Sequence, residues 1–203
     1  GRDFDPASLI DSAARATGVA PPAFHASRVE DEDWVRRSQS QFGPIRVAER
    51  LWIVPSWHTP PDPAAIVVRL DPGLAFGTGS HVSTRLVLQH LERNMRAGER
   101  VLDYGCGSGI LAIVAGILGA SEIAATDIDP QALATTAANA AGNGVAVNVA
   151  APDSLPPGTF DLVLANILAG PLVALEPLLA ARTRSGGRIA LSGILEAQAA
   201  EVV

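Results

Sequence analysis

The sequence has a single cysteine and no lysine, and both absences restrict the chemistry that its 203 residues can perform. Cys106 alone cannot form an internal disulfide or a zinc site built from several cysteines. Because all 15 basic residues are arginines, no lysine of this chain acts as a base or forms a Schiff base. No apolar run reaches the roughly 18 residues of a membrane span, and the N-terminus lacks a signal-peptide pattern. We therefore expect a protein of the reducing cytoplasm without a membrane segment.

Positive charge is also scarce, since the formal net charge is −6 at pH 7. A free-standing nucleic-acid binder usually carries a basic footprint, so we expect no direct binding of nucleic acid. An acidic surface suits a basic partner or a cationic ligand better. The hydrophobic share of 48% is too high for a disordered chain, and the length predicts one large domain with a small appendage.

The first 60 residues differ from the remainder, because they hold all three tryptophans, Trp34, Trp52 and Trp57. Residues 45–54 alternate loosely between apolar and polar side chains, which predicts a strand at the edge of a hairpin. Four prolines within residues 55–63 indicate a linker. We therefore divide the chain into a partial N-terminal region at 1–54, a linker at 55–63 and a main domain at 64–203.

The main domain repeats a pattern of a short apolar strand followed by a helix. The expected strands are 100–104, 122–126, 144–149, 160–164 and 188–191, and the expected helices are 83–95, 108–118, 130–143 and 171–183. Strands that alternate with helices imply a doubly wound, mostly parallel α/β sheet.

The strongest local motif is the glycine-rich stretch over residues 103–109, which lies between an expected strand and an expected helix. Its glycines Gly105, Gly107 and Gly109 let a ligand approach the backbone and the free N–H groups of the helix N-terminus. Dinucleotide binders need a third glycine three residues after the second, where this chain has Ile110. The observed spacing, with Asp103 two residues before the first glycine, instead looks like the cofactor turn of Rossmann-like methyltransferases.

Polar residues follow two further strands of the expected sheet. Asp127 lies 22 residues after Gly105, where an acidic side chain can accept both ribose hydroxyls of an adenosyl cofactor. The alternative is a capping or turn role, which Asp129 fits better because Pro130 follows it. Asn166 follows the fourth strand, where its amide can orient an amine nucleophile, although an ordinary turn asparagine is the simpler interpretation.

Other polar residues near these motifs have structural explanations. Three glycines within residues 70–81 suggest a mobile cover over the site. Thr84 after this loop either meets the cofactor or caps the next helix, and capping is favoured without further context. His81 is expected to be a hydrogen-bonding strut and Cys106 a small turn residue. The four histidines show no metal-ligand spacing, so we expect no metal.

Several segments together resemble the PrmA family of methyltransferases, which methylate the eleventh protein of the large ribosomal subunit. The matching segments are residues 33–34, 50–57, 70–84, 103–112, 127–131, 165–169 and 191–195. They follow the family's order from about Glu30 to the end of the chain. The loop and the Asn-Ile-Leu-Ala motif at 166–169 are far more specific than a glycine-rich turn alone.

The resemblance implies a function and a set of site residues. The family uses S-adenosyl-L-methionine and modifies lysine side-chain amines and an N-terminal amine. Its cofactor contacts fall here on Thr84, Gly105, Asp127 and Asn166, with Gly107 in the same turn, and Asn166 is the expected catalytic residue. The partial region 1–54 would then belong to a small α+β substrate-recognition domain, followed by the methyltransferase domain.

The chain departs from the family pattern at Ser38, Ser80 and Val82. We also expect the methyltransferase sheet to lack its last two strands, because the chain stops soon after the fifth. Alternative functions are methylation of another protein lysine or of a small molecule, and cofactor binding without turnover. A nicotinamide dehydrogenase is disfavoured by Ile110.

Overall fold

The computed structural model describes residues 6–21, 23–25, 42–71 and 81–202. Its internal contacts divide the chain into two units, Gly1–Ser40 and Gln41–Val203. Within the first unit, the structure describes helix α1 (Pro6–Thr17) and the few residues that follow it. Trp34, Ser38, Ser80 and most of the expected cover loop lie outside the described residues. The predicted division into 1–54, 55–63 and 64–203 stays a prediction.

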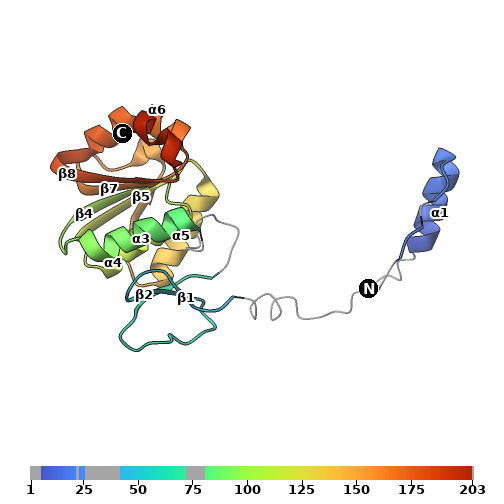
Figure 1. Cartoon of the computed structure of the whole chain (residues 1–203), viewed down its shortest axis with the longest axis horizontal. Helices are drawn as coiled ribbons and strands as arrows, with labels where there is room; N and C mark the ends of the chain where they lie inside the picture. Colours follow the sequence, from blue (N-terminus) through green and yellow to red (C-terminus); the bar gives the residue numbers. More distant parts are fainter. Residues whose placement is uncertain (1–5, 22, 26–41, 72–80, 203) are drawn as a thin grey trace. The chain divides into compact units, whose positions relative to one another are not determined.

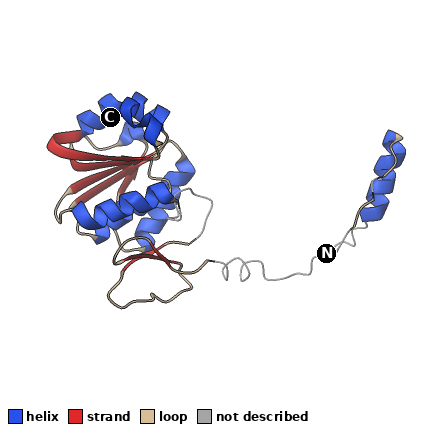
Figure 2. Ribbon diagram, viewed as in Figure 1, coloured by secondary structure: helices blue, strands red, loops and turns tan. Residues whose placement is uncertain are grey.

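A parallel sheet forms the centre of the second unit (Figure 2). It has five strands in the order β6-β5-β4-β7-β8. Its strands are β4 (Arg100–Tyr104), β5 (Glu122–Thr126), β6 (Asn148–Ala150), β7 (Phe160–Asn166) and β8 (Thr183–Ser192). The chain begins the sheet at β4, continues outward through β5 and β6, and then returns to the other side of β4 with β7. This topology confirms the predicted doubly wound sheet.

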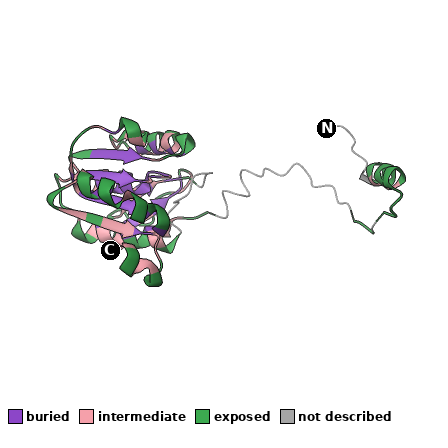
Figure 3. Cartoon of the chain, turned by 90° about the horizontal axis from the view of Figure 1, so that it is seen from above, coloured by how far each residue is buried: buried purple, intermediate pink, exposed green. Residues whose placement is uncertain are grey.

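Helices cover both faces of this sheet (Figures 1 and 3). They are α3 (Val82–Asn94), α4 (Ile110–Ile117), α5 (Pro130–Gly142), α6 (Ala169–Arg182) and the short α7 (Ala199–Val202). The alternation within β4 shows the two faces, because Val101 shares a core with α3 and α4, whereas Leu102 shares one with α6. Both residues are fully buried, as expected for a parallel strand that is covered on both sides.

A second, three-stranded sheet packs against α3. Strand β1 (Ile45–Arg46) pairs antiparallel with β2 (Leu51–Val54), and β2 pairs in parallel with β3 (Ile66–Arg69). The prediction of one strand over 45–54 was therefore wrong in extent, because a turn separates β1 from β2. Strand β3 was not predicted.

Several side chains hold this small sheet to the helices. The Glu92 carboxylate of α3 accepts the backbone N–H groups of Glu49 at 2.8 Å and Arg50 at 2.7 Å. The Asn143 side chain, at the end of α5, accepts from the Arg69 N–H at 2.7 Å and donates to the Arg69 carbonyl at 2.8 Å. The predicted linker 55–63 lies in the connection from β2 to β3, where the Arg69 guanidinium donates to the Pro55 carbonyl.

Local glycine signals misplaced some boundaries. The helix predicted to end at Thr183 before Ser185, Gly186 and Gly187 does end at Arg182. The predicted strand 188–191 was wrong in extent, because β8 begins at Thr183 and includes these three residues. They form an irregularity in the pairing with β7, which passes from Phe160 opposite Thr183 to Leu162 opposite Arg188. None of the described helices is long and apolar enough to cross a membrane.

Candidate active site at the carboxyl edge of the sheet

The glycine turn connects β4 to α4 and is tied to the neighbouring strand. The N–H groups of Gly105 and Cys106 both donate to the Thr126 carbonyl at the end of β5, at 2.8 and 3.0 Å. Gly105 has a φ of 82°, and Gly107 also has a positive φ, a region that glycine adopts without steric cost. The backbone thus bends sharply where β4 leaves the sheet, and its N–H groups lie at the carboxyl edge.

Asp127 supports this turn from the end of β5. One carboxylate oxygen accepts the Gly107 N–H and the other accepts the Asp129 N–H, both at 3.0 Å. Asp129 caps α5 by accepting from the Gln131 N–H at 2.8 Å, which confirms that Asp129 is the capping residue of this pair. Asp127 is left half-buried beside the turn, and its predicted contact with ribose stays a prediction.

A second carboxylate, Asp103, lies fully buried beneath the turn. One of its oxygens accepts the Ala112 N–H at 3.1 Å, and the other has no hydrogen-bond partner among the described residues. Burial raises the pKa of Asp103 to about 7 and the nearby charge of Asp127 adds to this, whereas the Ala112 N–H opposes it. Asp103 was predicted only as part of the glycine-rich motif, although an acidic residue in a largely apolar strand is itself a signal of a special role.

Thr84 and Asn166 are brought together from positions 82 residues apart. The Asn166 amide donates to the Thr84 hydroxyl at 3.1 Å, and Thr84 is buried on α3. Capping, which the residues alone favoured for Thr84, is instead performed by His81, whose Nδ1 accepts from the Ser83 N–H at 3.2 Å. His81 is therefore the strut that the sequence predicted, and Thr84 is available to orient Asn166.

Residues near the end of β8 complete this part of the site, and the sequence analysis assigned them no role. Ser192 is paired with Asn166 in the sheet, and its hydroxyl donates to the Ser83 carbonyl at 3.2 Å. The ends of β7 and β8 and the start of α3 therefore meet at Asn166. Contacts between separate elements carry this arrangement, so residue spacing could not reveal it.

The remaining nucleophile of the region is not chemically activated. Burial raises the pKa of the Cys106 thiol to about 12, with a further contribution from the charge of Asp103. The Thr136 hydroxyl donates to the sulfur at 3.2 Å. A thiol with this pKa carries almost no thiolate at neutral pH, which agrees with its expected role as a turn residue. The described residues contain no cluster of three or more potential metal ligands.

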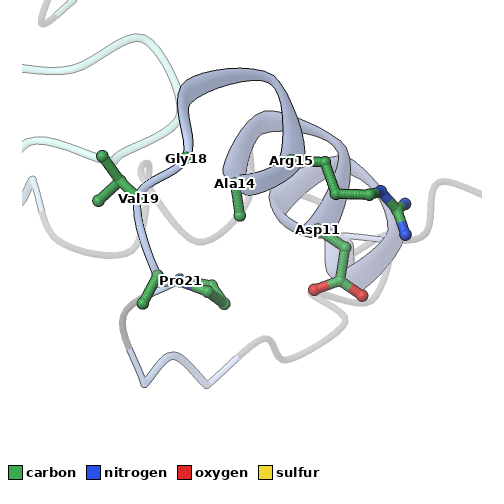
Figure 4. A pocket seen from close by; sticks show the side chains of 7 residues that line it. Asp11, Ala14, Arg15, Gly18, Val19 and Pro21 are labelled. Carbon is green, nitrogen blue, oxygen red and sulfur yellow. The ribbon is translucent and has the colours of Figure 1, made fainter.

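A separate hollow lies in the first unit, beside α1 and the residues that follow it (Figure 4). Its lining consists of Asp11, Ala14, Arg15, Gly18, Val19, Ala20 and Pro21. None of the predicted site residues belongs to it. The candidate site is thus confined to the carboxyl edge of the parallel sheet, where ligands of open α/β sheets bind.

Comparison with known proteins gives a consistent result. The family model "Ribosomal protein L11 methyltransferase (PrmA)" matches residues 3–203. A ribosomal protein L11 methyltransferase of Cupriavidus pinatubonensis is 57% identical over 203 residues, which cover 100% of this chain and 68% of that protein. The same enzyme of Burkholderia lata is 53% identical over 201 residues, covering 98% and 67%. A crystal structure of a ribosomal protein L11 methylase from Lactobacillus delbrueckii subsp. bulgaricus has a TM-score of 0.71 and 38% identity, covering 79% of this chain and 85% of that one.

Proposed function

Because the chain belongs to the ribosomal protein L11 methyltransferase family, we propose that it transfers methyl groups from S-adenosylmethionine to amines of ribosomal protein L11. The amines are lysine side-chain amines, the N-terminal amine, or both. The observation that carries the proposal is the Asn166 amide, which Thr84 holds in place at the same sheet edge as the glycine turn.

The residues at this edge fit the cofactor. Gly105 and Gly107 present a side-chain-free backbone, and Asp127 has a carboxylate able to accept from the ribose hydroxyls. Among the described residues, Asp127 forms no ion pair, so its carboxylate contributes a negative potential that favours a cation. When bound, S-adenosylmethionine supplies a methyl group on a positively charged sulfonium, an electrophile that needs no further activation.

Asn166 is proposed to orient the amine. Its Nδ2 donates to Thr84, and no described residue donates to its Oδ1, which is therefore free to accept an N–H of the substrate. A hydrogen bond to that N–H directs the nitrogen lone pair along the line of attack. Positioning of this kind is the main task when the electrophile is already reactive.

The amine must enter in its neutral form, because an ammonium has no lone pair. A free lysine amine has a pKa of roughly 10.4, and removal from water lowers it. The chain is therefore proposed to bind, desolvate and align the amine.

The partner follows from charge and from the family. The net charge of −6 favours a basic protein over a nucleic acid, and a ribosomal-protein substrate supports a reaction in the cytoplasm. Residues 1–54 are proposed as part of the substrate-recognition region and 55–63 as its linker, with residues 64–203 as the methyltransferase domain.

Replacement of Asn166 by alanine tests the proposal. We expect the kcat for methylation of L11, measured with labelled cofactor, to fall about 100-fold, as for a misplaced reactant. The matched control is Asn148→Ala, which removes an exposed asparagine from β6 and should leave kcat unchanged. Mass spectrometry of the product identifies the modified amines. Wild-type turnover in Asn166→Ala would remove the orienting role, and cofactor binding without any transfer by the unaltered chain would indicate a binding module.

A further inference from the structure

We propose that Ile167 and Gly193 are positioning residues for Asn166, an inference that rests on the proposed function. Ile167 follows Asn166 directly and lies between two glycines from different strands. Gly105 follows β4, and Gly193 follows β8. Both glycines have a positive φ, of 82° and 85°, and both are in close contact with Ile167.

The contact on one side involves the Ile167 side chain. A Cβ added to Gly105 would lie 2.3 Å from the Ile167 Cγ2 atom, whereas the next nearest atom, Ile167 Cβ, is 3.8 Å away. The missing side chain at Gly105 therefore makes room for Ile167 within the protein itself. This requirement is separate from the approach of any cofactor to the same turn.

The contact on the other side involves the Ile167 backbone. A Cβ added to Gly193 would lie 2.4 Å from the Ile167 carbonyl oxygen, 3.0 Å from its carbonyl carbon and 3.3 Å from its nitrogen. That nitrogen belongs to the peptide bond that joins Asn166 to Ile167. The bend after β8 is thus packed directly against the main chain that carries the Asn166 side chain.

The contacts of Ile167 with Gly105 and Gly193 restrain the backbone that carries Asn166. Its backbone pairs with Ser192 in the sheet, and its amide donates to Thr84, but neither contact restrains the chain beyond Asn166. The Gly105–Ile167–Gly193 packing supplies that restraint. A displacement of about 1 Å in a positioned group can lower the rate about 100-fold. We therefore expect this packing to affect kcat for methylation more than the affinity for L11.

The test compares Gly193→Ala with Gly98→Ala. Gly98 has a φ of 86°, nearly that of Gly193, but a Cβ added to it would meet nothing within 4 Å. Both variants therefore acquire the same left-handed backbone strain, and only Gly193→Ala displaces the Ile167 peptide. We expect kcat for L11 methylation to fall 10- to 100-fold in Gly193→Ala alone, with KM for L11 within about twofold of wild type.

A kcat of Gly193→Ala equal to that of Gly98→Ala would overturn the inference. If Gly193→Ala does not fold, Ile167→Ala replaces it, because it removes the Cγ2 atom over Gly105 without backbone strain. It should lower kcat at unchanged KM, and Ile167→Val, which keeps Cγ2, should restore it. A wild-type kcat in Ile167→Ala would equally overturn the inference. Failure of the unaltered chain to methylate L11 would instead refute the proposed function.

Discussion

In the protein without ligands, the free energy of unfolding should fall as pH rises toward 7, and replacement of Asp103 by asparagine should abolish this fall. Asp103 is buried beneath the glycine turn, and burial raises its pKa from 3.8 to about 7, with the charge of Asp127 adding to the effect. Asparagine has the same shape and keeps an acceptor for the Ala112 N–H, but it does not titrate. The two proteins therefore differ mainly in the proton that Asp103 binds.

The sign of the effect follows from the folded-state pKa, which is the higher one. Between pH 3.8 and about 7, the folded state keeps the Asp103 proton while the unfolded state has lost it. A rise in pH through this window therefore favours unfolding, and the stabilisation present at low pH is lost by about pH 7. At roughly 1.36 kcal/mol per pKa unit, the total loss is about 4 kcal/mol.

The assay is urea unfolding of wild type and Asp103→Asn at pH values from about 4 to 8.5. The difference between the two free energies of unfolding should change by up to about 1.4 kcal/mol per pH unit below pH 7 and stay constant above it. Acids with a lowered pKa, such as Asp161 beside the Arg100 N–H, destabilise the fold only as pH falls, and they cancel in the difference. A constant difference across the whole range would show that Asp103 is not protonated in the folded protein.

Three further predictions concern neighbouring contacts. In a double-mutant cycle, the effects of Gly105→Ala and Ile167→Ala on the unfolding free energy should differ from additivity by at least about 0.5 kcal/mol. The reason is that Ile167→Ala removes the Cγ2 atom that would lie 2.3 Å from the new Cβ at position 105. Additive effects would contradict that packing. The buried Cys106 thiol, with its pKa of about 12, should not react with iodoacetamide at pH 7.5 until urea unfolds the chain. Mass spectrometry detects the alkylated product. Rapid alkylation of the native protein would argue against the burial of this thiol. Glu92→Ala should lower the unfolding free energy by about 1 kcal/mol, because two backbone N–H groups of exposed residues exchange a carboxylate acceptor for water. The exposed Glu196→Ala should not lower it.

The main sheet was predictable because its signals are local. Strand β7 is buried along most of its length, so it stands out as an apolar run. The Asp129-Pro130 pair marks the start of α5 by a side-chain acceptor and a fixed φ, and the structure shows that cap. Such features depend on a few adjacent residues, and they persist when the chain folds.

The errors occurred where distant partners decide the structure. Ser185, Gly186 and Gly187 are typical of a loop, and they lie in the irregular part of β8, between Thr183, which pairs with Phe160, and Arg188, which pairs with Leu162. Strand β3 has only four residues after a proline-rich segment, and its parallel partner β2 is separated from it in sequence. The extent of β8 and the existence of β3 therefore depend on strand partners that are distant in sequence.

The candidate site also contains some features that local sequence predicts and others that depend on distant contacts. The glycine turn and Asp127 were found because they lie close in sequence to a strand end. The bond between Asn166 and Thr84 depends on how α3 packs across the ends of the strands, which no spacing encodes. The sequence explained Gly105 by the approach of a ligand, whereas the structure adds Ile167 as a second reason.

The paired hydrogen bonds between Asn143 and Arg69 have a consequence for the behaviour of the protein in concentrated solution. Strand β3 is at the edge of its sheet, and an unpaired edge is a template on which another chain can add a strand. By accepting from the Arg69 N–H and donating to its carbonyl, the Asn143 amide takes the place of a neighbouring strand at that residue. One side chain at the end of a helix thereby leaves no free backbone N–H at Arg69 to which an added strand could bind.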